Sequence, residues 1–167
     1  MLRNRAWQKN FKYQDKPGWC GQAVIQMALR AAGIKKSQKS ITKDVYQPWW
    51  GTTQQAMLAY LSRFFNSLGY QENSRKSDIN FHLKKKRLII VDWWDDIDSD
   101  EEPDGHYSLI LAFDKKQNKL TLADPSAGRG IWQIEAKKFE SKWYDYLDIN
   151  KKLKLRGWLL WIDPASY

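Results

Sequence analysis

The sequence lacks most features of secreted and membrane-spanning proteins. Its single cysteine cannot form a disulfide within the chain, and its longest apolar run is too short to cross a bilayer. The basic segment 1–7 has no apolar stretch like that of a signal peptide. Internal repeats and linkers rich in proline, glycine or serine are also missing. We therefore expect one domain over residues 1–167, located in a reducing cytoplasm, with leaderless export as the alternative.

Acidic residues are scarce outside one segment. The net charge is +9, yet the segment 92–104 contains eight acidic residues and no basic one. The rest of the chain is strongly basic, which favours contact with polyanions such as nucleic acid or an anionic membrane. Because the basic residues are scattered, we expect a solvated surface instead. The acidic segment does not match a calcium-binding loop, so we expect no metal; it either attracts a basic substrate or is a solvated loop.

The pattern of apolar residues changes along the chain from helical spacing to strands. Helices are expected at 21–32, from 40 or 42 to 46, at 53–68, at 78–85 and at 139–146. Strands are expected at 87–93, 107–113, 119–123, 130–135 and 158–162, with a hairpin turn at 114–118. Helices followed by an antiparallel sheet predict an α+β fold.

The chemistry-bearing residues begin with Cys20, which directly precedes the first apolar helix. A helix N-terminus presents partial positive charge and free N–H groups, which favour a thiolate. His106 follows Gly105 at the start of a strand, and Gly105 leaves room for a close approach by backbone or substrate. Asp124 ends the strand that is joined to the His106 strand by a hairpin. This order predicts a nucleophile, a base and a residue that orients the base.

Each of these residues also has a structural interpretation. A histidine at a strand start is often structural, and an Asp-Pro pair is a common turn, as Asp163-Pro164 shows. The pairing with the only cysteine favours His106, whereas His82 is expected on a surface helix without a role. The side-chain amide of Gln14, with the N–H of Cys20, is a candidate oxyanion hole.

Taken together, these residues resemble the papain-like cysteine peptidases. The order is Gln14, Cys20-Gly21, an apolar helix, Gly105-His106 and Asp124-Pro125. It is most similar to the peptidases that trim double-glycine leaders from bacteriocin precursors, and to their stand-alone relatives. The resemblance implies a papain-like fold, Cys20 as nucleophile, His106 as base and acid, Asp124 as orienting residue and Gln14 as oxyanion donor.

The chain departs from that family at two positions beside the nucleophile. Gln22 stands where the family usually has proline, and Trp19 where an acidic residue is common. We expect no attached transporter segment. Trp19 is expected to line the cleft beside the thiol, and Trp49 and Trp50 to line its opposite side.

The sequence thus predicts a cysteine peptidase that acts on a peptide or protein without a cofactor. The same three residues also serve acyl transfer to an amine, or hydrolysis of a side-chain or cell-wall amide. A different class is a binding module that is not an enzyme, in which aromatic and basic residues hold single-stranded nucleic acid.

Overall fold

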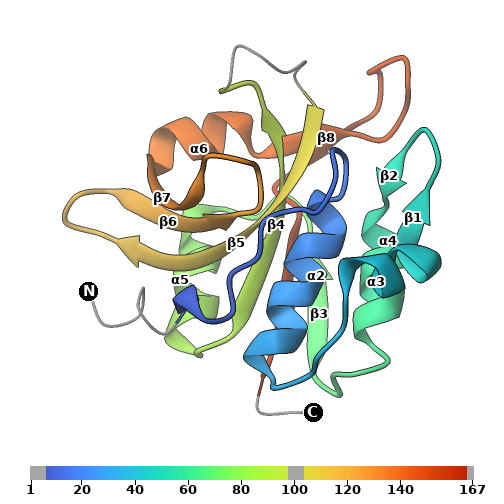
Figure 1. Ribbon diagram of the computed structural model, residues 1–167. Coiled ribbons are helices and arrows are strands. Elements are labelled where there is room, and N and C mark those ends of the chain that lie inside the picture. The colour runs from blue at the N-terminus through green and yellow to red at the C-terminus, as the bar shows by residue number, and fades with distance from the viewer. Residues whose placement is uncertain (1–6, 98–103, 165–167) are drawn as a thin grey trace.

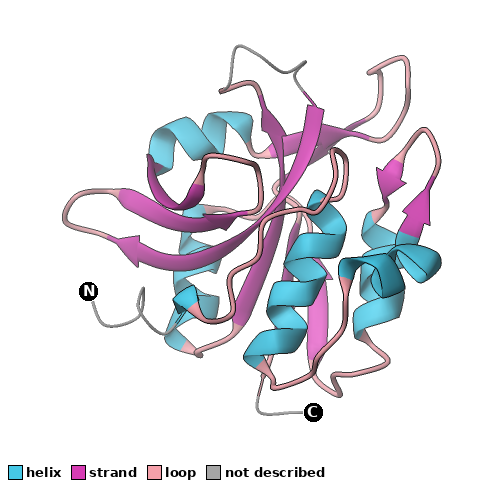
Figure 2. Ribbon diagram, in the orientation of Figure 1, coloured by secondary structure: helices cyan, strands magenta, loops and turns pink. Residues whose placement is uncertain are grey.

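A computed structural model describes residues 7–97 and 104–164 and shows helices packed on a large antiparallel sheet (Figure 1, Figure 2). The helices are α2 (Cys20–Ala31), α3 (Gln38–Val45), α4 (Gln54–Leu61), α5 (Lys76–Lys84) and α6 (Ala136–Lys142). The strands are β1 (Tyr46–Gln47), β2 (Gly51–Thr52), β3 (Leu68–Gln71), β4 (Leu88–Asp95), β5 (Asp104–Asp114), β6 (Lys119–Asp124), β7 (Gly130–Glu135), β8 (Tyr144–Tyr146), β9 (Lys154–Arg156) and β10 (Leu159–Ile162). The expected α+β fold is confirmed. None of the helices in these two stretches is long and apolar enough to cross a membrane.

The main sheet has the strand order β3-β10-β4-β5-β6-β7, and every neighbouring pair is antiparallel. Strand β10 therefore lies inside the sheet, between β3 and β4. On β4, Leu88 and Ile90 pack in a core with α2, α3 and α4, whereas Ile89 and Val91 pack in a second core with α5 and α6. Burial on both faces explains why this strand is continuously apolar.

Helix α2 is fixed by its apolar face. Val24, Ile25, Ala28 and Leu29 of α2 are fully buried, at the spacing of one helical face, and α2 packs against both α3 and β5. Figure 1 shows α2, α3 and α4 grouped at one side of the sheet. The first residue of α2 is therefore held beside β5.

Two expected helices are shorter than the apolar spacing suggested. Helix α4 begins after Thr53, whose side chain accepts a hydrogen bond from the Ala56 N–H, but it ends at Leu61 rather than at 68. Leu68 begins β3, because it pairs with Ile162 of β10. Helix α6 ends at Lys142, and Tyr144–Tyr146 forms β8, which pairs with β9. The remaining expected helices and strands are confirmed within a few residues of their ends.

Candidate active site

Cys20 is the first residue of α2, and its thiol is partly exposed. Trp19 occupies the N-cap position, but its side chain makes no capping hydrogen bond, and the first turn contains no acidic residue. The N-cap side chain therefore does not occupy the free N–H groups at the start of this helix. An anion on the sulfur or on a bound carbonyl oxygen is stabilised there by the helix dipole.

Gly21 allows β2 to pack directly on the start of α2. A β-carbon at Gly21 would overlap the side chain of Thr52, so any larger residue would push β2 away. The carbonyl of Thr52 accepts a hydrogen bond of 2.9 Å from the buried Tyr107 hydroxyl of β5. These contacts connect α2, β2 and β5 around the thiol.

The hairpin of β5 and β6 brings His106 and Asp124 together. Leu109 pairs with Ala123. Continuing this register places Asp124 opposite Ser108, diagonally from His106, where side chains still reach each other. The Nε2 of His106 lies 2.8 Å from Asp124 Oδ1, and the two residues are 7% and 0% exposed. A carboxylate can only accept, so Nε2 is the donor and Nδ1 is left for Cys20.

The charges in this pair stabilise each other. Burial alone would lower the pKa of His106, but the Asp124 carboxylate, with a further contribution from the Cys20 thiol, raises it well above its usual range. Burial likewise opposes ionisation of Asp124, yet His106, the Ser126 N–H and Arg129 hold the pKa of Asp124 below its usual range. Both shifts favour the charged forms, an imidazolium beside a carboxylate.

Arg129 binds Oδ2 of Asp124, the carboxylate oxygen that does not contact His106. Its guanidinium donates to Asp124 Oδ2 at 3.2 Å and binds both carboxylate oxygens of Asp95 on β4. The indole Nε1 of Trp132 also donates to Asp124 Oδ2, at 3.3 Å. With Oδ1 on His106, the orientation of the carboxylate is fixed from several directions.

We expect Arg129→Met to lower kcat/KM for peptide hydrolysis about tenfold, because Asp124 would lose a charged donor that is only 10% exposed. The pH profile of kcat/KM should also change, since Arg129 helps to hold the pKa of Asp124 low. Arg63→Met is the matched control, because it removes an exposed ion pair with Asp44. An Arg129 variant with the activity and pH profile of the control would contradict this role.

Gln14 lies beside the turn that follows Asp124. Its backbone N–H donates to the Pro125 carbonyl at 2.9 Å, which connects the segment before α2 to the end of β6. Its side-chain Oε1 is buried without a hydrogen-bond partner. The structure thus places Gln14 beside the turn at Asp124, and the oxyanion role of its amide stays a prediction.

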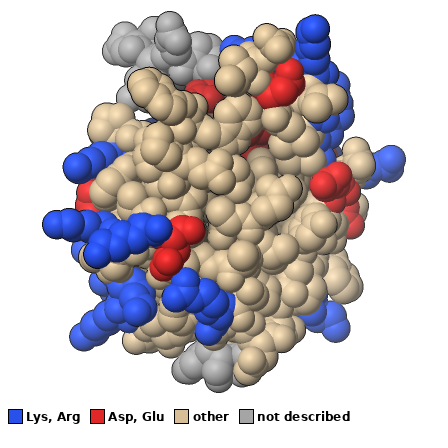
Figure 3. Space-filling model, turned by 90° about the vertical axis from the view of Figure 1, so that its right-hand side faces the viewer, with Lys and Arg blue, Asp and Glu red and all other residues tan. Residues whose placement is uncertain are grey.

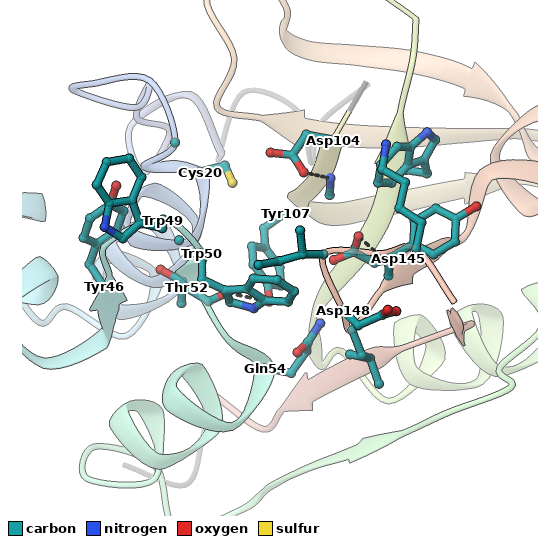
Figure 4. Close-up of a pocket in the computed structure, with 18 residues that line it drawn as sticks. Cys20, Tyr46, Trp49, Trp50, Thr52, Gln54, Asp104, Tyr107, Asp145 and Asp148 are labelled. Carbon is teal, nitrogen blue, oxygen red and sulfur yellow. Dashed lines mark hydrogen bonds between the residues drawn. The ribbon is translucent and has the colours of Figure 1, made fainter. Parts of the chain in front are cut away.

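A cavity of about 350 Å³ opens beside Cys20 (Figure 4). Gly105, Trp49 and Trp50 line it, as expected, and Trp49 is 99% exposed. Trp19 is not among the lining residues; the Lys16 ammonium lies 5.2 Å from the centre of its ring. Three acidic residues, Asp104, Asp145 and Asp148, also line the cavity.

The acidic segment 92–104 is not a single loop. Asp92 is buried in β4, Asp95 ends that strand, and Asp104 begins β5. Asp98, Asp100, Glu101 and Glu102 lie outside the described residues. Within the part of the chain that the structure describes, no group of three or more His, Cys, Asp and Glu side chains is arranged to hold a metal ion.

The sequence interpretation missed several residues around the site and misplaced one histidine. Asp92 interrupts the apolar strand 88–94, and a carboxylate at a buried strand position is a signal that was available. Asp145 was expected in a helix, and nothing local indicates its contact with Gly105. His82 is not on the surface: it is 3% exposed and stacks on Trp161, which explains its presence structurally.

Comparison with known proteins gives one family and a consistent set of folds. Residues 6–149 match the Peptidase C39 like family. No curated protein sequence matches the chain. The peptidase domain of Streptococcus ComA, a bifunctional ABC transporter involved in a quorum-sensing pathway, is 14% identical with a TM-score of 0.67, over 90% of this chain and 96% of that domain.

Two further solved structures have the same fold. A protein from Bacillus anthracis described as a C39-like peptidase is 12% identical with a TM-score of 0.62, over 92% of this chain and 94% of its own. A double glycine motif protease from an AMS/PCAT transporter, solved with its leader peptide, is 16% identical with a TM-score of 0.61, over 91% of this chain and 89% of its own. The papain-like fold expected from the sequence is therefore confirmed.

Proposed function

Because the chain belongs to the Peptidase C39 like family and is a cysteine peptidase, we propose that it hydrolyses a peptide bond with Cys20 as nucleophile. The observation that carries this assignment is the buried His106–Asp124 pair, with Nδ1 left for the thiol at the start of α2. A nucleophilic thiol acts only while reduced, which agrees with the reducing cytoplasm that we predict from the sequence.

In the first half of the reaction, the Cys20 sulfur attacks the carbonyl carbon of the substrate. The carbonyl electrons move to oxygen, and this oxyanion is stabilised by the N–H of Cys20 and by the Gln14 side-chain amide. His106 then gives its Nδ1 proton to the leaving amine as the C–N bond breaks. The acyl group remains on Cys20 as a thioester.

In the second half, His106 accepts a proton from water, and the resulting hydroxide equivalent attacks the thioester carbon. The C–S bond breaks, the carboxylic acid leaves, and the thiolate–imidazolium pair is restored. Asp124 keeps Nε2 protonated throughout, so that Nδ1 alone moves protons.

We expect the purified protein to cleave members of an internally quenched peptide library, and Cys20→Ala to lose at least about 10⁴-fold in rate. The library should contain two consecutive glycines in some members, because one structural neighbour is a double glycine motif protease. Intact-mass measurement should find the acyl group on Cys20 during turnover. Cleavage that survives in Cys20→Ala would contradict the mechanism.

A second experiment on the cleaved peptides distinguishes hydrolysis from acyl transfer. In H₂¹⁸O with an added primary amine, hydrolysis incorporates one ¹⁸O into the new carboxylate, whereas transfer gives an amide with the added amine. We expect the labelled carboxylate as the main product. A predominant amide product would identify the protein as an acyltransferase that uses the same residues.

A further inference from the structure

The cavity beside Cys20 has an unusual combination of walls. One side is formed by the β1–β2 hairpin with Trp49 and Trp50, and the other by the start of β5, β8 and the segment after β8. Figure 4 shows Asp145 and Asp148 on the side across from Cys20, and Asp104 nearer to Cys20 in this view. A volume of about 350 Å³ is in the range of ligand-binding cavities.

Within residues 7–97 and 104–164, none of the three carboxylates that line this cavity forms an ion pair with a basic side chain. Backbone N–H groups donate to them: Gly105 N to Asp104, Tyr146 N to Asp145, and Lys152 N and Leu153 N to Asp148. Asp145 also shares a side-chain hydrogen bond with Asp92. Other acidic residues of the described chain do form ion pairs, such as Asp44 with Arg63, Asp95 with Arg129 and Asp96 with Lys142. The cavity is therefore a negative site in a protein with a net charge of +9.

A fourth carboxyl group lies beneath the cavity. Asp92 is 1% exposed; its Oδ2 accepts from Gln54, which lines the cavity, and its Oδ1 has no hydrogen-bond partner. Burial, and then the nearby Asp145, raise the pKa of Asp92 well above its usual range. Burial, with a contribution from Asp104, raises the pKa of Asp145 to about 6. For both groups burial is the largest cause of the shift, and a neighbouring carboxylate adds to it.

Aromatic rings around the same space already contact ammonium groups. The Nζ of Lys151, a lining residue, lies 4.7 Å from the centre of the Trp94 ring, and Lys154 Nζ lies 5.3 Å from that of Tyr146. Aromatic faces attract cations through their quadrupole. Lys151 is exposed, so it can leave the Trp94 face when a substrate enters.

Gly105 connects this cavity to the reacting atoms. It directly precedes His106, and a β-carbon on it would overlap the carboxylate of Asp145. Asp145 therefore packs against the backbone that carries the proposed base. A substrate side chain that reaches Asp145 must belong to a residue at or near the cleaved bond.

From these observations we infer that the cavity binds the cationic side chain of a lysine or arginine next to the bond that is cleaved. The inference rests on the proposed peptidase function, because that function places the peptide at Cys20. Figure 3 shows one face of the molecule, on which the Lys and Arg side chains lie mainly toward the edges.

The test compares two peptides that differ only in a lysine or a norleucine at a position beside the cleaved bond. Norleucine keeps the aliphatic chain and lacks the ammonium group. We expect kcat/KM to be at least about tenfold higher for the lysine peptide. Equal values within about twofold, at every position beside the cleaved bond, would overturn the inference.

Variants of the acidic lining residues test whether the preference for lysine comes from the cavity. Asp145→Asn should lower the lysine-to-norleucine ratio about fivefold. Asp104→Asn tests the same charge at an exposed position, where folding is not at risk, and should also lower the ratio. Asp44→Asn is the control, because it makes the same change on the distant helix α3 and should preserve the ratio. A ratio that is unchanged in both cavity variants would overturn the inference.

Peptide binding to the Cys20→Ala variant tests the cavity independently of catalysis. Fluorescence anisotropy with labelled forms of the same two peptides measures affinity in a protein that cannot cleave. Tighter binding of the lysine peptide, with no cleavage by the unchanged protein, would support the cavity and contradict the proposed function. Cleavage without any preference in rate or binding would retain the proposed function and overturn the cavity.

Discussion

Replacing His106 with alanine is expected to slow the alkylation of Cys20 by iodoacetamide at pH 5–6 by at least about 100-fold. The reason is the raised pKa of His106, which keeps the imidazole positively charged beside the sulfur in this range. Only the thiolate reacts, and the adjacent positive charge favours it. Without the imidazole, the sulfur loses this neighbouring charge, and the reaction at pH 5–6 should slow.

The chain provides an internal control for this experiment. It contains only two histidines, and the other one, His82, is equally buried but stacks on Trp161. His82→Ala should therefore retain the rapid reaction at acidic pH. Because Cys20 is the only thiol, mass spectrometry reads its modification without ambiguity. Equal pH profiles for the two histidine variants would exclude a thiolate–imidazolium pair.

Replacing Asp124 with alanine is expected to reduce both activity and stability. Loss of the orienting carboxylate should lower kcat/KM about 10³–10⁴-fold, because His106 can then adopt the wrong tautomer. The free energy of unfolding should fall by about 3–5 kcal/mol, since the buried charge of His106 loses its partner and Arg129 keeps only Asp95. Asp124→Asn retains the shape of the side chain and should be the less destabilised of the two.

The stability loss should depend on pH in a defined direction. The pKa of Asp124 is lowered by folding, so its contribution is present above the unfolded value of about 4 and is lost as the pH falls further. The pKa of His106 is raised by folding, so its contribution is complete below about 6.5 and is lost as the pH rises through the folded value. The difference in unfolding free energy between the unchanged protein and Asp124→Ala should be largest between about pH 4 and 6.5. Urea unfolding across pH 3–9 would measure it, and a constant difference would contradict the ion pair.

Local patterns were sufficient to predict the elements that carry the proposed triad. The apolar spacing after Cys20 predicts α2, and the apolar runs around 88–91, 107–113 and 119–123 predict three adjacent strands. Both predictions are possible because burial on one or both faces requires apolar residues at regular positions in the sequence. The hairpin between β5 and β6 then predicts that His106 and Asp124 lie together.

Residues whose environment depends on distant strands could not be placed in this way. Leu68 continues the spacing of α4 but belongs to β3, because its partner on β10 lies far along the chain. Tyr144–Tyr146 continues α6 by composition but pairs with β9, where Trp94 of β4 packs on Tyr144 and Tyr146. The acidic cavity depends on β8, and this is why Asp145 was missed.

The position of β10 inside the main sheet also has a consequence for folding kinetics. β10 pairs with β3 on one side and β4 on the other, and both partners lie far earlier in the chain. Pairing of such distant segments is slow, because a long loop must close before any contact compensates for its entropy. A chain cut before Leu159 would lose an interior strand rather than a tail. During synthesis the sheet behind the thiol therefore cannot be completed until β10 has left the ribosome, and we expect Cys20 to become reactive only after that step.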